Sequence, residues 1–86
     1  MKKLKLILNK MWHMGMCLNK KDSDVINEME TFECGNLLVR FFTNEMLKNE
    51  SDEPAWFVCV IKENNEEIWY KTKNRKLLDE AMNCLA

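Results

Sequence analysis

The first eighteen residues carry apolar side chains at the spacing of a helix. The apolar positions recur three and four residues apart, as on one face of an amphipathic helix, and the lysines fall mostly on the other face. The residues of the apolar face are Leu4, Ile7, Leu8, Met11, Trp12, Gly15 and Leu18. The pattern predicts a helix over residues 3–18, although Leu4, Leu6 and Leu8 by themselves would also suit a strand.

Residues 23–34 support two interpretations. The residues with helical spacing are Val25, Ile26, Met29 and Phe32. They fit a short second helix, and Gly35 would follow its C-terminal end, where glycine is common. The competing interpretation is a hairpin built from Glu28–Phe32 and Leu37–Thr43 around Cys34-Gly35. The pattern alone leaves both open.

Two more strands follow. Leu37–Thr43 is rich in branched and aromatic residues, which is typical of a strand. The polar and acidic residues 44–53 predict a surface loop, and Pro54 begins a second strand at a position where a missing N–H is tolerated. Asn64-Asn65 suits a two-residue hairpin turn that leads into a third strand, because Asn tolerates positive φ angles.

The end of the chain predicts a helix, which completes the expected fold. Asn74 can cap this helix by accepting a hydrogen bond from its first turn. Its inward face would be Leu77, Leu78, Ala81, Cys84 and Leu85. We therefore expect one α+β domain over residues 1–86, with an N-terminal helix, the optional short helix, a three-stranded antiparallel sheet and a C-terminal helix.

A two-residue turn at Asn64-Asn65 fixes a register for the last hairpin. It places Ile61 opposite Ile68 and Cys59 opposite Tyr70, and opposed residues share a face of the sheet. One face is then Phe57, Cys59, Ile61, Ile68 and Tyr70, which reads as core. The other face is Trp56, Val58, Val60 and Trp69.

This second face is a candidate partner-binding surface. Two helices usually cover one side of a small sheet, and an exposed apolar patch on a small protein commonly marks an interface. The alternative is that the first helix covers Trp56, Val58, Val60 and Trp69 while the terminal helix covers the opposite face. A second copy of the chain is a third way to cover them, as a homodimer.

Composition narrows the class of protein. An apolar content of 47%, with three Trp and four Phe in 86 residues, argues against a disordered chain. The four cysteines form no C-x-x-C pair, and Asn9, Lys10 and His13 interrupt the apolar run behind the N-terminal lysines. We therefore expect no secretion signal, no membrane span and a reduced, cytoplasmic environment.

Charge is segregated along the chain. Residues 1–21 contain six lysines and no acid, whereas residues 22–53 contain nine acids against Arg40 and Lys48. The candidate acidic binding residues are Asp22, Asp24, Glu28, Glu30 and Glu33. A basic cluster at the start of the last helix is a candidate anion or nucleic-acid site, made of Lys71, Lys73, Arg75 and Lys76. Such asymmetry bears on binding partners and not on the fold.

No constellation for catalysis stands out. His13 and Cys17 would share one helical face, but a metal site needs further ligands, and the other cysteines are scattered singly. Two isolated glycines exclude a glycine-rich phosphate loop. We therefore expect neither an enzyme nor a metal or cofactor site.

The order of helix, three strands and helix over residues 3–18 and 36–86 resembles the double-stranded-RNA-binding domain in topology and size. In that family a basic cluster at the start of the final helix grips phosphates, and Lys73, Arg75 and Lys76 fall at the corresponding place. The resemblance implies a nucleic-acid-binding module. The family's Lys-Lys-x-Ala-Lys signature is missing here, and the acidic residues 22–53 would repel a nucleic-acid backbone.

The leading hypothesis is a small, non-enzymatic inhibitor or adaptor that binds another protein. Small size, acidic segment and apolar patch suit such a role, since acidic side chains can occupy the basic groove of a nuclease by mimicry. The composition, rich in Lys, Asn and Glu, is typical of short proteins of mobile elements. The specific form of the hypothesis is a phage (viral) anti-defence protein of the anti-CRISPR kind.

Overall fold

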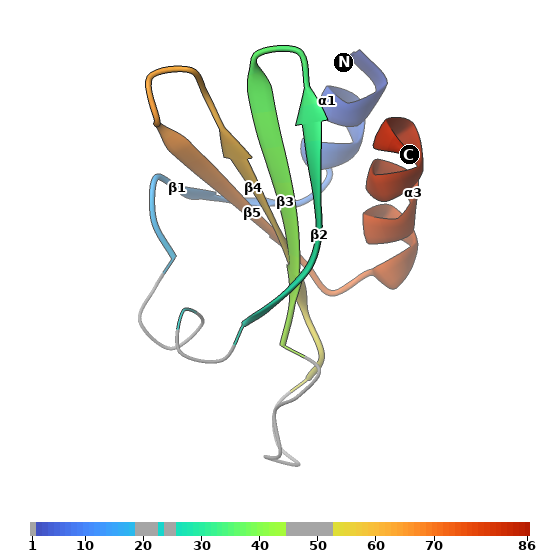
Figure 1. Cartoon of the computed structure of the whole chain (residues 1–86). Coiled ribbons are helices and arrows are strands. Elements are labelled where there is room, and N and C mark those ends of the chain that lie inside the picture. The colour runs from blue at the N-terminus through green and yellow to red at the C-terminus, as the bar shows by residue number, and fades with distance from the viewer. Residues whose placement is uncertain (1, 19–22, 24–25, 45–52) are drawn as a thin grey trace.

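The computed structural model describes residues 2–18, 23, 26–44 and 53–86. In this part of the chain, helices α1 (Lys2–Leu8) and α3 (Arg75–Leu85) pack side by side on a five-stranded antiparallel sheet (Figure 1). The strands are β1 (Trp12–Gly15), β2 (Asn27–Cys34), β3 (Leu37–Thr43), β4 (Trp56–Ile61) and β5 (Glu67–Thr72), in the order β1-β5-β4-β3-β2. The expected α+β class with terminal helices is confirmed, but the expected three-stranded sheet is wrong.

The N-terminal segment is a short helix followed by a strand. Helix α1 ends at Leu8, and its last turn continues into hydrogen bonds from Lys10 N–H to the Ile7 carbonyl and from Met11 N–H to the Leu8 carbonyl. Strand β1 then pairs with β5, and its Gly15 has a φ of 85°, which a right-handed helix does not allow. The predicted helix over 3–18 is therefore wrong beyond Leu8, because pairing with the edge of β5 outweighs local helix propensity.

Strands β2 and β3 form the hairpin that was one of the two interpretations of residues 23–34. Cys34 pairs with Leu37, which leaves Gly35 and Asn36 as the loop. Gly35 has a φ of 59°, and a positive φ at the first loop residue is what type II′ hairpin turns reserve for glycine. The second-helix interpretation is wrong for Asn27–Cys34, and Val25 lies outside the described residues.

The β4–β5 hairpin has a loop of three residues, not two. The N–H of Lys62 donates to the carbonyl of Glu66, and the N–H of Asn65 donates to the carbonyl of Lys62, both at 2.9 Å. Asn65 takes a φ of 66°, as the last residue of such a loop requires.

The extra loop residue shifts the register by one position. Ile61 lies opposite Glu67, and Cys59 lies opposite Trp69. The register predicted from a two-residue turn is therefore wrong. A slip of one residue moves every side chain of β5 to the other face relative to β4.

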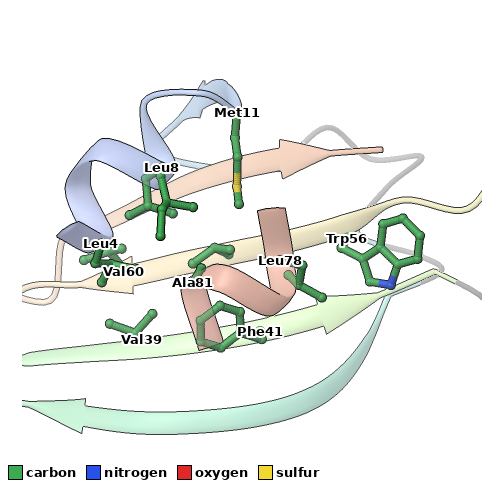
Figure 2. Packing of buried hydrophobic residues seen from close by; sticks show 11 residues of the cluster. Leu4, Leu8, Met11, Val39, Phe41, Trp56, Val60, Leu78 and Ala81 are labelled. Carbon is green, nitrogen blue, oxygen red and sulfur yellow. The ribbon is translucent and has the colours of Figure 1, made fainter. Parts of the chain in front are cut away.

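Both helices cover the same face of the sheet. Figure 2 shows α3 placing Leu78 and Ala81 over β3 and β4, with Leu4 and Leu8 of α1 beside them. The sheet contributes Val39, Phe41, Trp56, Val58 and Val60 to this helix-side core. Asn74 caps α3 as predicted, since its side chain accepts from the N–H of Lys76 at 2.9 Å. The predicted inward face of α3 is also confirmed, because its residues are buried or packed against this core.

The opposite face of the sheet is buried as well, although no described helix lies on it. Its core residues are Phe42, Ala55, Phe57, Cys59 and Trp69. Met14, Leu18 and Ile26, which come from β1 and the segments next to β1 and β2, pack against them. The sheet thus has two apolar faces, and the described helices cover one of them.

Candidate functional site

The four apolar side chains predicted to form a binding patch do not form one. Trp56, Val58 and Val60 lie in the helix-side core, and Trp69 lies on the opposite face of the sheet. Trp56 is 7% exposed and Trp69 is 8% exposed. The Trp69 ring lies against Phe42 with a centroid separation of 5.2 Å. A partner or a second copy of the chain therefore meets no continuous apolar surface made of these residues.

The acidic candidates that the structure describes lie on an edge strand. Glu28, Glu30 and Glu33 belong to β2 and are exposed. We call these three residues the acidic edge. Strand β2 ends the sheet and has β3 as its strand neighbour in the described part of the chain. Asp22 and Asp24 lie outside the described residues.

The register divides the acidic edge between the two faces of the sheet. Glu30 lies opposite Phe41, which points to the helices. Glu33 lies opposite Leu38, which is three positions from Phe41 and therefore points to the other face of the sheet. Because neighbouring positions alternate in direction, the two carboxylates flank the edge from opposite sides. They are three positions apart, which corresponds to about 10 Å along a strand.

Glu28 is committed to an internal contact. Its carboxylate pairs with the Arg40 guanidinium at 2.9 Å and accepts a hydrogen bond from the Thr31 hydroxyl. The hydrogen bond from Arg40, and then that from Thr31, hold the pKa of Glu28 below its ordinary value. Glu30 and Glu33 form no ion pair with another described residue. These two carboxylates therefore carry the uncompensated charge of the acidic edge.

The basic cluster is held by partners within the protein. Lys73 pairs with Glu53 at 2.9 Å, and Arg75 pairs with Asp79 at 3.0 Å. The Arg75 guanidinium also lies 5.7 Å from the ring centroid of Trp56. Lys76 lies in the first turn of α3, but its backbone N–H is taken by the Asn74 cap. The start of α3 is therefore less open to an anion than the sequence indicates.

Lys71 contributes to a different surface, which the sequence analysis missed. A groove of about 530 Å³ opens where β1 meets the junction between β5 and α3. It is lined by Lys10, Met11, Trp12, Lys71, Thr72, Lys73, Asn74 and Leu77. We call it the Trp12 groove. Trp12 was assigned to the buried face of a helix, whereas in β1 it is 58% exposed. One sequence signal could have indicated this groove: Trp12 lies two residues after a lysine, in a segment that can form an edge strand.

His13 and Cys59, which carry the chemically reactive groups imidazole and thiol, contact other side chains of the fold. His13 lies in β1, so the helical spacing that would join it to Cys17 does not exist, and its ring meets Tyr70 edge to face at 5.3 Å. Burial raises the pKa of the Cys59 thiol to about 12, which disfavours the nucleophilic thiolate at neutral pH. Within the described ranges, no three His, Cys, Asp or Glu side chains are grouped to hold a metal ion.

Two further observations concern membrane-spanning helices and similarity to known proteins. None of the described helices combines the length and apolar character needed to cross a membrane. Comparison with known proteins finds no matching family model, no significantly similar curated protein and no significantly similar solved structure.

Proposed function

We propose that this protein is a non-enzymatic binding protein that places its acidic edge in a basic, nucleic-acid-binding cleft of a partner protein and occludes that cleft. The observation that carries the proposal is the position of Glu30 and Glu33 on an edge strand, where neither forms an ion pair with another described residue. Carboxylates in such a place are hydrated and ready to meet lysine or arginine side chains, which fixes register and speeds encounter.

The geometry favours a cleft over a flat surface as the partner. Glu30 and Glu33 point to opposite sides of the edge, so only a surface that encloses the strand contacts both. The outer side of β2, next to which no other described strand lies, also offers backbone groups that can extend a partner's sheet. A phage anti-defence role, with a nuclease as the partner, is the specific form of this proposal.

Charge reversal tests the acidic edge. The tagged protein is used to capture partners from bacterial lysate with and without nuclease treatment, beside the E30K/E33K variant. The matched control is E63K/E80K, which makes the same change in net charge at exposed positions of the β4–β5 loop and of α3. We expect the tagged protein to capture a nucleic-acid-binding protein, and this capture should persist after nuclease treatment. Added DNA should displace the partner, and the partner should bind E30K/E33K at least about 10-fold more weakly than wild type.

Three results contradict the proposal. Loss of every captured protein after nuclease treatment shows that nucleic acid and not protein is bound. Equal capture by wild type and E30K/E33K shows that the edge is not the contact. Equal weakening by E63K/E80K shows that overall charge, and not the acidic edge, governs binding.

A further inference from the structure

The Trp12 groove lies at the sheet edge opposite to the acidic edge. Strand β1 ends the sheet on one side and β2 ends it on the other (Figure 1). Of the described residues that line the groove, three are lysines and none is acidic. The groove therefore offers a positive surface that is separate from the proposed protein-binding edge.

The indole of Trp12 is presented at the surface of this groove. The other two tryptophans are buried, whereas Trp12 is 58% exposed. Trp12 lies opposite Lys71 in the β1–β5 register, and the Lys73 ammonium lies 5.8 Å from the centroid of its ring. A flat aromatic surface with cations beside it suits a ligand that has both a planar ring and a negative charge.

Two hydrogen bonds order the polar groups where β5 meets α3. The Thr72 hydroxyl accepts from the N–H of Asn74 at 3.0 Å, and the Asn74 side chain accepts from the N–H of Lys76 at 2.9 Å. These bonds hold the β5–α3 junction in one shape. They also fix the orientation of the Asn74 side chain, whose NH2 group these two bonds do not use.

Among the described residues, Glu53 pairs weakly with a lysine of the groove. Glu53 meets Lys73 at 2.9 Å, but both side chains are at least half exposed. Pairs of this kind are screened by water and salt. An incoming phosphate can therefore replace the Glu53 carboxylate at Lys73 without disturbing buried structure.

We propose that the Trp12 groove binds a single-stranded nucleic acid, with one base stacked on Trp12 and the neighbouring phosphates held by Lys10 and Lys73. Inorganic anions would use the lysines but not the indole. A duplex keeps its bases stacked on each other and out of reach of the ring. Because every base has a flat ring that can stack on an indole, the binding is tolerant of base identity.

The direct test is fluorescence anisotropy of a labelled oligothymidylate of about twelve nucleotides, a length within the usual site size for single strands. Between about 50 and 200 mM salt, two lysine–phosphate contacts predict a slope of log K against log salt of about −1.4. W12A should bind about 5- to 150-fold more weakly, from the usual contribution of one stacked base, and W12F should keep most of the affinity. K10A and K73A should each make the slope shallower by about 0.7. K62A, on the exposed β4–β5 loop, is the matched control and should change nothing.

A second measurement uses the unaltered protein, so that folding of the variants is not at issue. Acetylation of lysines, read by mass spectrometry, should be slowed by the oligonucleotide at Lys10 and Lys73 and not at Lys62. Absence of an anisotropy change at the lower salt overturns the proposal, as does equal affinity of W12A and wild type. Thymidine monophosphate that competes as well as the strand overturns it in favour of a free nucleotide. Since the acidic edge plays no part in this test, its failure leaves the proposed protein partner untouched.

Discussion

Burial of both faces of the sheet makes a specific prediction for Phe57. This side chain is 0% exposed on the face that no described helix covers, and Phe41 is equally buried on the helix side. We expect F57A to destabilise the protein as much as F41A, by about 3–5 kcal/mol, because each removes a large buried ring and leaves a cavity. A sheet open to water on one side would instead make F57A a surface change, within about 0.5 kcal/mol of wild type.

The size of the effect is large for a chain of this length. A domain of 86 residues is expected to have about 4–13 kcal/mol of stability. A loss of 3 kcal/mol therefore lowers the melting temperature by about 12 °C or more. The Lys71 ammonium lies 5.5 Å from the Phe57 ring centroid. F57A removes this cation–π contact, which adds about 0.5–1 kcal/mol to the destabilisation at a partly exposed site.

Urea unfolding measures the prediction, with tryptophan fluorescence and far-UV circular dichroism followed together. F32A is the control, since Phe32 is only partly buried on the helix side and should lose less than F41A. The free energy of unfolding should fall with urea concentration at the same slope in all variants, which shows that the unfolded state has not changed. If F57A costs less than about 1 kcal/mol while F41A costs 3 or more, the reasoning is refuted and that face is open.

Three further predictions concern single groups. N44A should lower the free energy of unfolding by about 1–3 kcal/mol in urea titrations, because the buried Asn44 side chain accepts a backbone N–H across the base of the β3–β4 connection; an unchanged midpoint would show that this bond is dispensable. At pH 8 a thiol reagent should modify the exposed Cys17 at once and Cys59 only as the protein unfolds, since burial raises the pKa of Cys59 to about 12; fast modification of both would contradict the burial. The pKa of Glu28 is lowered by Arg40, so its stabilisation is present in full above the ordinary value of 4.5 and is lost as the pH falls through the lowered folded value. Melting temperatures of wild type and E28Q should therefore converge below that range, and a constant difference would argue against the ion pair.

Local signals were sufficient for the last helix and for most strands. Asn74 and the apolar spacing after it predict the cap and inward face of α3 because both depend on neighbours within a few residues. Strands β3, β4 and β5 are likewise recognisable from their branched and aromatic residues.

The register of the β4–β5 hairpin was not predictable, for a physical reason. Strand β4 is apolar at every position and buried on both faces, so no alternation shows which residues of β5 lie opposite. The Asn64-Asn65 pair fits a loop of two residues or of three. The choice between them is made by packing on both sides of the sheet, which involves residues far apart in the sequence.

The Trp12 groove escaped prediction because its residues meet only in the folded chain. The spacing of Leu4, Ile7 and Leu8 is helical, and Trp12 fits the same spacing although it lies outside the helix. What ends the helix is the long-range pairing of β1 with β5, and the same pairing brings Trp12 beside Lys71. The acidic edge was easier to predict, since a cluster of acids is visible in the sequence whichever fold it adopts.

The place of β5 in the sheet also decides when this protein can fold during synthesis. Residues 2–15 leave the ribosome before the rest of the sheet, yet β1 pairs with β5 and α1 lies beside α3 (Figure 1). Strands β2, β3 and β4 are successive neighbours and can associate as they emerge. The N-terminal segment must wait for residues 67–85, so its exposed Leu4, Ile7 and Leu8 are surfaces on which a chaperone can act in the meantime.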